Sequence, residues 1–135
     1  MSWLLDTNIC SYVLKRRFGI FDKLRSHSPS AIHVCAITVA EARAGAMRAA
    51  NAERILAAWS FFLSPFEERI LPFDKSAAEV YGDIRATLER KGTMIGDRDC
   101  MIAAIALCHG LTVVTANVDE FQRVPGLSLE DWCVR

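Results

Sequence analysis

Short apolar runs alternate with helical segments along the whole chain, and this alternation is the feature that most limits its fold. The predicted strands cover residues 3–5, 31–35, 69–73 and 111–115, with a fifth at 127–129. Short apolar strands separated by helices are typical of a parallel sheet covered by helices on both faces. The sequence therefore predicts an α/β fold built on a short parallel sheet.

Apolar residues at helical spacing, together with cap residues, predict the helices between these strands. Six helices are expected: after Asp6, from Gly19, from Thr38 to about Ala50, from near Asn51, after Asp74 as far as Gly92, and from about Arg98 to His109. The helix after Asn51 carries a wide aromatic surface. It includes Trp59, Phe61, Phe62 and Phe66, which suits either the core or a groove for a partner.

Length and composition indicate one domain over residues 1–135, since a chain of this size with 52% hydrophobic residues fills a single core. The 16 basic and 16 acidic residues cancel. Bulk positive charge therefore cannot be what attracts a nucleic acid, and a local basic patch or a metal ion would have to do so. Lys15–Arg17 is one candidate rim for an RNA backbone, although a basic helix end complementing the dipole is the more common role.

The five cysteines are odd in number and form no C-x-x-C pair, which argues against a disulfide framework or a zinc site. Free cysteines in apolar stretches favour a reducing cytosol. The first residues lack the basic flank and long apolar run of a signal peptide, and no stretch is long enough for a membrane span. We expect a soluble cytoplasmic protein.

Acidic residues are predicted to meet at one edge of the sheet. Asp6 directly follows the first strand, and Glu41 lies early in the helix after the second. Asp99 opens the helix that leads through Gly110 into the strand at 111–115, so it starts at the carboxyl edge of that strand. Asn117 and Asp119 follow the same strand. Ligands of open α/β sheets bind outside these carboxyl ends.

Carboxylates gathered in one cleft repel one another by up to about 4 kcal/mol per pair at close range, and a bound cation relieves this repulsion. Oxygen ligands without cysteine or histidine select Mg²⁺, or alternatively Mn²⁺, over zinc. Because Mg²⁺ commonly combines one or two carboxylates with substrate phosphate, the pattern indicates phosphodiester hydrolysis by a metal-activated water.

A series of short segments, in order along almost the whole chain, resembles the PIN-domain ribonucleases, and in particular their VapC toxin subgroup. The segments are Leu4–Ile9, Ala36–Glu41 with Gly45, Tyr81–Ala86, Lys91–Gly92, Ile95–Asp99, Val114–Asn117, Glu120–Phe121, Val124–Leu127 and Glu130–Trp132. The resemblance implies a three-layer α/β/α domain and an endoribonuclease that depends on Mg²⁺ or Mn²⁺. The substrate class it implies is structured RNA, with tRNA as one candidate.

The resemblance also implies a homodimer and a cognate antitoxin that occludes the active site, with operator DNA bound only through the antitoxin. Carried over by position, Asp6 and Asp99 are the main metal ligands and Glu41 is the third acid. Asn117 departs from the aspartate of many PIN domains, which leaves Asp119 or Glu120 as the fourth acid and puts a second metal site in doubt.

Structural roles compete for some of these residues. Asp6 could cap the first helix, and Glu41 could close a capping box with Thr38. Asp97 is expected nearer the cap of its helix than Asp99.

Two other functions compete with the ribonuclease. One is an RNA-binding module that has lost catalysis. The other is a metal-dependent phosphohydrolase with Asp6 as nucleophile, although such enzymes generally need an aspartate where Asn8 stands.

Overall fold

The computed structural model describes the whole chain from Met1 to Arg135. Its elements are β1 (Trp3–Leu5), α1 (Thr7–Leu14), α2 (Ile20–Arg25), η1 (Pro29–Ala31), β2 (Ile32–His33), α3 (Ala36–Met47), α4 (Ala52–Leu63), η2 (Ser64–Arg69), α5 (Lys75–Lys91), α6 (Asp97–His109), β3 (Thr112–Val114), α7 (Val118–Phe121) and β4 (Leu129–Glu130). No helix is long and apolar enough to cross a membrane.

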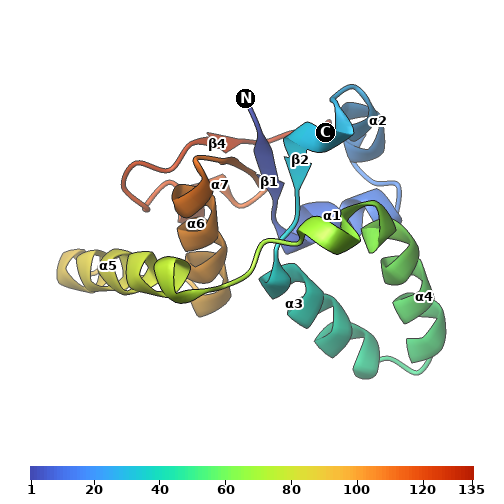
Figure 1. Ribbon diagram of the computed structural model, residues 1–135, viewed down its shortest axis with the longest axis horizontal. Helices are drawn as coiled ribbons and strands as arrows, with labels where there is room; N and C mark the ends of the chain where they lie inside the picture. The colour runs from blue at the N-terminus through green and yellow to red at the C-terminus, as the bar shows by residue number, and fades with distance from the viewer.

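The four strands form one parallel sheet in the order β2-β1-β3-β4. Helices α5 and α6 lie on one side of β1, and α1, α3 and α4 lie on the other (Figure 1). Neighbouring residues of a strand point to opposite faces. Leu4 therefore packs in the core cluster that contains the α5 and α6 residues, whereas Leu5 packs in the cluster that contains those of α1 and α4. This is the predicted three-layer arrangement.

The prediction of a strand at 69–73 is wrong except at one residue. Leu71 forms a single parallel bridge with Cys35, through its N–H to the carbonyl of Val34 and its own carbonyl to the N–H of Ala36. Pro72 follows, and because proline has no N–H the pairing cannot continue. The second strand is likewise shorter than predicted, since η1 precedes it and α3 begins soon after it.

Two glycines end the long helices that frame the acidic edge. Gly92 and Gly110 adopt φ values of 66° and 63°, the left-handed conformation that closes a helix without a steric penalty. Gly110 turns the chain directly from α6 into β3, so α6 runs antiparallel to β3. The first turn of α6 therefore lies at the carboxyl edge of the sheet.

Candidate active site

Asp6 directly follows β1 and is the N-cap of α1, so it does have the helix-capping role that the sequence offers as an alternative. Its Oδ1 accepts a hydrogen bond of 2.9 Å from the N–H of Ile9, and the residue is only 4% exposed. Burial raises the pKa of Asp6 to about 6, Glu41 and Asp131 add repulsion, and the Thr115 hydroxyl and the Ile9 N–H lower it. A cap bond uses one carboxylate oxygen, which leaves the other for a ligand.

Glu41 does not close a capping box, and that alternative is wrong. α3 begins at Ala36 with Cys35 as its N-cap, so Glu41 lies in the second turn. Its Oε1 accepts a bond of 2.6 Å from the Thr7 hydroxyl. Its Oε2 lies 3.2 Å from Nε of Arg98. Glu41 is therefore oriented by side chains of α1 and α6 rather than by its own helix.

Asp99 lies in the first turn of α6, half-buried among other acids. Desolvation raises its pKa to about 6, with further repulsion from Glu120, Asp6 and Glu41, while Arg98 lowers it. The structure thus brings Asp99 close enough to Asp6 and Glu41 for their charges to interact, although the three residues come from separate parts of the chain.

Glu120, and not Asp119, joins this group. Oε1 of Glu120 accepts a bond of 2.7 Å from the N–H of Gly96, and Oε2 accepts one of 2.5 Å from Nδ2 of Asn117. These two bonds, the first being the stronger influence, hold the pKa of Glu120 below its usual value. Asp119 is exposed and does not line the acid pocket described below. The sequence pattern offers Glu120 only as an alternative to Asp119.

Asp97 is the first residue of α6 and lies nearer the cap than Asp99, as expected, but its side chain does not cap the helix. The N-cap is Gly96, and no side chain bonds to the N-terminus of the helix as a cap. Asp97 instead accepts bonds from Arg85 and from the Tyr81 hydroxyl, both on α5. Arg85 thereby ties α5 to the rim of the acidic edge.

Glu41, Asp97 and Asp99 line an open pocket, the acid pocket, with a volume of about 530 Å³ and no hydrophobic lining residue, whereas Asp6 and Glu120 are not among its lining residues. Its lining residues are Asn8, Glu41, Gly96, Asp97, Arg98 and Asp99. It contains no histidine, so a histidine acid–base pair is not available for cleavage of RNA through the ribose hydroxyl.

The donor chemistry of the acid pocket fits a hard divalent cation, but the side chains do not form a ready-made ligand set. No group of three His, Cys, Asp or Glu side chains is close enough together to hold one metal ion. Glu41 is turned towards Thr7 and Arg98, and Glu120 towards Gly96 and Asn117. The candidate ligands are all oxygen, and the charges of Glu120, Asp6 and Glu41 repel that of Asp99, a repulsion that a bound cation would relieve.

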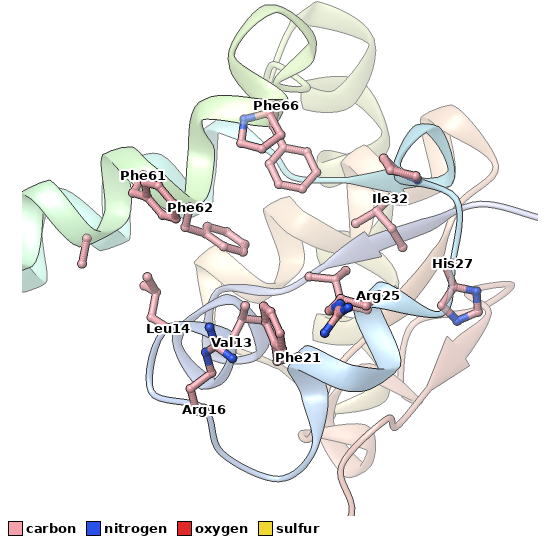
Figure 2. Close-up of a pocket in the computed structure, with 14 residues that line it drawn as sticks. Val13, Leu14, Arg16, Phe21, Arg25, His27, Ile32, Phe61, Phe62 and Phe66 are labelled. Atoms are coloured by element: carbon pink, nitrogen blue, oxygen red, sulfur yellow. The ribbon is translucent and has the colours of Figure 1, made fainter.

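A separate apolar pocket of about 680 Å³ lies on the α1, α2 and α4 side of the sheet. Phe61 and Phe62 of α4 face Val13 and Leu14 of α1 and Phe21 of α2 across it (Figure 2). Trp59 and Phe66 are buried, whereas Phe61 is 84% exposed. The predicted aromatic surface therefore divides into core residues and an open apolar patch.

Comparisons with known proteins agree with this fold. Residues 3–127 match the model of the PIN domain. The chain is 40% identical over 133 residues to the tRNA(fMet)-specific endonuclease VapC of Salmonella typhimurium, covering 98% of this chain and 99% of that protein. It is 35% identical to Ribonuclease VapC2 of Rickettsia felis, with 98% of each covered. The crystal structure of DNA-bound VapBC from Salmonella typhimurium superimposes with a TM-score of 0.90 at 40% identity, over 98% of this chain and 99% of that one.

Proposed function

This chain belongs to the PIN-domain family, as an endoribonuclease of the VapC toxin type, and we propose that it cleaves RNA with a divalent cation held by Asp6, Glu41 and Asp99. The observation that supports this proposal most is that Asp6, Glu41 and Asp99, which are far apart in the sequence, lie close enough together for their charges to interact. Neighbouring carboxylates kept despite their mutual repulsion are typical of a functional site.

Each residue would contribute through a particular atom. Asp6 offers the carboxylate oxygen that its cap bond leaves free, and Asp99 offers a carboxylate on a rigid first helical turn. Glu41 would exchange Arg98 for the cation while Thr7 keeps holding its other oxygen. Glu120, held by Gly96 and Asn117, can accept a hydrogen bond from the attacking water.

A divalent cation bound here supplies Lewis acidity and a nucleophilic hydroxide at neutral pH. Because the attacking oxygen would come from water and not from the ribose, we expect a 5′-phosphate and a 3′-hydroxyl as product ends. Mg²⁺ is the ion we propose, with Mn²⁺ as an alternative that the same oxygen ligands accept.

The substrate we propose is a structured RNA, cut where bases are exposed in a loop. A tRNA is one candidate, since the relative from Salmonella typhimurium is named for cleavage of tRNA(fMet).

The test is cleavage of total tRNA by the purified chain in EDTA, in Mg²⁺ and in Mn²⁺. We expect cuts with 5′-phosphate ends only when a metal is present. Full activity in EDTA would exclude the metal mechanism. Binding of tRNA without any cleavage in either metal would indicate instead an RNA-binding module that has lost catalysis.

The partners are an antitoxin protein and, through it, operator DNA, since similar solved structures are VapBC complexes bound to DNA, in the case of Rickettsia felis to a fragment from their promoter. We propose that the antitoxin packs on the apolar pocket around Phe61 and places a basic side chain in the acid pocket. The open phenyl ring of Phe61 and the flanking Arg16 and Arg25, which stack on Phe21, provide its anchor. A homodimer is the expected assembly.

A further inference from the structure

A groove of about 460 Å³ runs beside the acid pocket, between α1 and α4. The two share Asn8 and Glu41 as lining residues, so the α1–α4 groove opens directly into the acid pocket. From the shared end, Ser11 and Lys15 continue along α1, and Arg54 of α4 faces them.

Polar side chains make up the α1 wall of this groove except at Leu14, although the Thr7 hydroxyl is already donated to Glu41. Thr7, Asn8, Ser11 and Lys15 recur at the spacing that places residues on one side of a helix. The row leads away from the acid pocket and ends in a positive charge. An extended chain of acceptors could therefore be bound along it.

Two cations of the groove are not neutralised within the protein. Lys15 and Arg54 are exposed, and neither side chain takes part in an ion pair. By contrast, Arg85 and Arg98 near the acid pocket are both paired with carboxylates. Lys15 and Arg54 are therefore free to bind an anion.

The floor of the groove is made of small residues of α3. Ala42, Gly45 and Ala46 line it, and a Cβ added at Gly45 would meet only the end of Arg48, at 4.0 Å. Larger side chains at these positions would fill the space between α1 and α4. The groove is therefore open along its length.

We propose that the α1–α4 groove binds the sugar–phosphate backbone of the RNA on one side of the scissile bond, with Lys15 and Arg54 contacting its phosphates. This inference rests on the proposed ribonuclease function. The chain has no net charge, and its acid pocket repels a polyanion, so RNA binding requires local cations beside that pocket. Lys15 and Arg54 provide such cations, and Asn8 and Ser11 of α1 offer donors that fit phosphate and ribose oxygens.

The test measures RNA binding by Lys15→Gln and Arg54→Gln in an Asp99→Asn background, in which cleavage is expected to stop. The probe is a fluorescein-labelled single-stranded RNA of about 12 nucleotides, titrated in Mg²⁺ over a salt series. Each variant should bind about threefold to fivefold more weakly. The slope of log affinity against log salt should fall by about 0.7 for each phosphate that the variant no longer neutralises.

Lys91→Gln and Arg43→Gln are the matched controls, because both residues are exposed and make no ion pair. They should leave affinity and salt slope unchanged. In the wild-type background, Lys15→Gln and Arg54→Gln should raise KM and leave kcat nearly unchanged, because neither residue touches the reacting atoms.

Unchanged RNA affinity and salt slope in both groove variants would overturn the proposal. So would loss of antitoxin binding with RNA binding intact, which would assign the groove to the protein partner. Failure of the ribonuclease proposal would be seen separately, as metal-independent cleavage by the wild type or undiminished cleavage by Asp99→Asn.

Discussion

The hydroxyl of Thr7 donates a hydrogen bond of 2.6 Å to Oε1 of Glu41, joining the first turn of α1 to the second turn of α3. The same hydroxyl lies 3.0 Å from that of Thr38, which is fully buried. Glu41 therefore has one oxygen held by a partly buried pair of threonine hydroxyls and the other paired with Arg98, which the proposed cation would displace. Thr7 is a positioning residue for the proposed third metal ligand.

Replacing Thr7 by valine keeps the shape of the side chain and removes the bond to Glu41. Loss of an outer partner of a metal ligand typically lowers metal affinity or activity by about 10- to 100-fold. We expect the Mg²⁺ concentration for half-maximal cleavage to rise within that range. Thr7→Ser should restore most of the activity. Equal Mg²⁺ dependence in the valine variant and the wild type would show that Thr7 does not position Glu41.

Glu120→Gln and Asp119→Asn separate the two candidates for the fourth acid. Glu120 is held by Gly96 and Asn117 and repels Asp99, whereas Asp119 is exposed. Cleavage by Glu120→Gln should fall by about 100-fold, the scale expected when a general base is removed, and Asp119→Asn should remain close to wild type. Slower cleavage by Asp119→Asn than by Glu120→Gln would instead assign the role of fourth acid to Asp119. Circular dichroism melts of both variants control for unfolding.

The alternation of strands and helices is enough to predict the layers, because the apolar positions in a single sequence show which faces of these elements are buried. The third strand is mispredicted because residues 69–73 have the apolar pattern, while Pro72 limits pairing and no neighbouring strand continues past Cys35. The sequence places the start of α3 at Thr38, since its hydroxyl and Glu41 imitate a capping box. Thr38 is instead buried inside the helix and bonded to Thr7.

Topology also accounts for the part of the site that the sequence can predict. Asp6, Glu41 and Asp99 are placed by strand ends and helix starts, which the pattern reveals. The bond from Gly96 to Glu120 depends on how the start of α6 and the short helix α7 meet in space, which no local sequence pattern predicts. The dual role of Asp6 is missed for a different reason. Capping and ligand binding look like exclusive alternatives in a sequence, although the cap bond uses only Oδ1 of the carboxylate and the proposed metal would bind the other oxygen.

Phe61→Ser tests the partner surface separately from catalysis. The ring is 84% exposed beside the apolar pocket, so its loss should change the free energy of unfolding by no more than about 0.5 kcal/mol. Antitoxin affinity should fall about 30-fold or more, as for an aromatic anchor. RNA cleavage should be unchanged. Met47→Ser, at an exposed apolar residue outside this pocket, is the control, and equal loss of antitoxin binding in both variants would contradict the assignment.

The last prediction concerns the charge of Asp6 and the pH dependence of stability. Its pKa is about 6 in the folded protein and near 3.8 in the unfolded chain, so the folded state holds the proton more tightly. In EDTA, the free energy of unfolding should therefore fall as pH rises from about 4 to about 6, by on the order of 1 to 3 kcal/mol from this group. Asp99 acts in the same direction.

Asp6→Asn removes the charge but keeps the cap on α1, because asparagine caps a helix about as well as aspartate. At pH 7 in EDTA this variant should melt above the wild type, and its stability should fall less steeply between pH 4 and 6. Asp6→Ala removes the cap as well and should be about 1 kcal/mol less stable than the asparagine variant. Excess Mg²⁺ should stabilise the wild type by mass action and barely shift Asp6→Asn. If wild type and Asp6→Asn show equal pH slopes and equal Mg²⁺ shifts, Asp6 is a helix cap only and does not bind the metal.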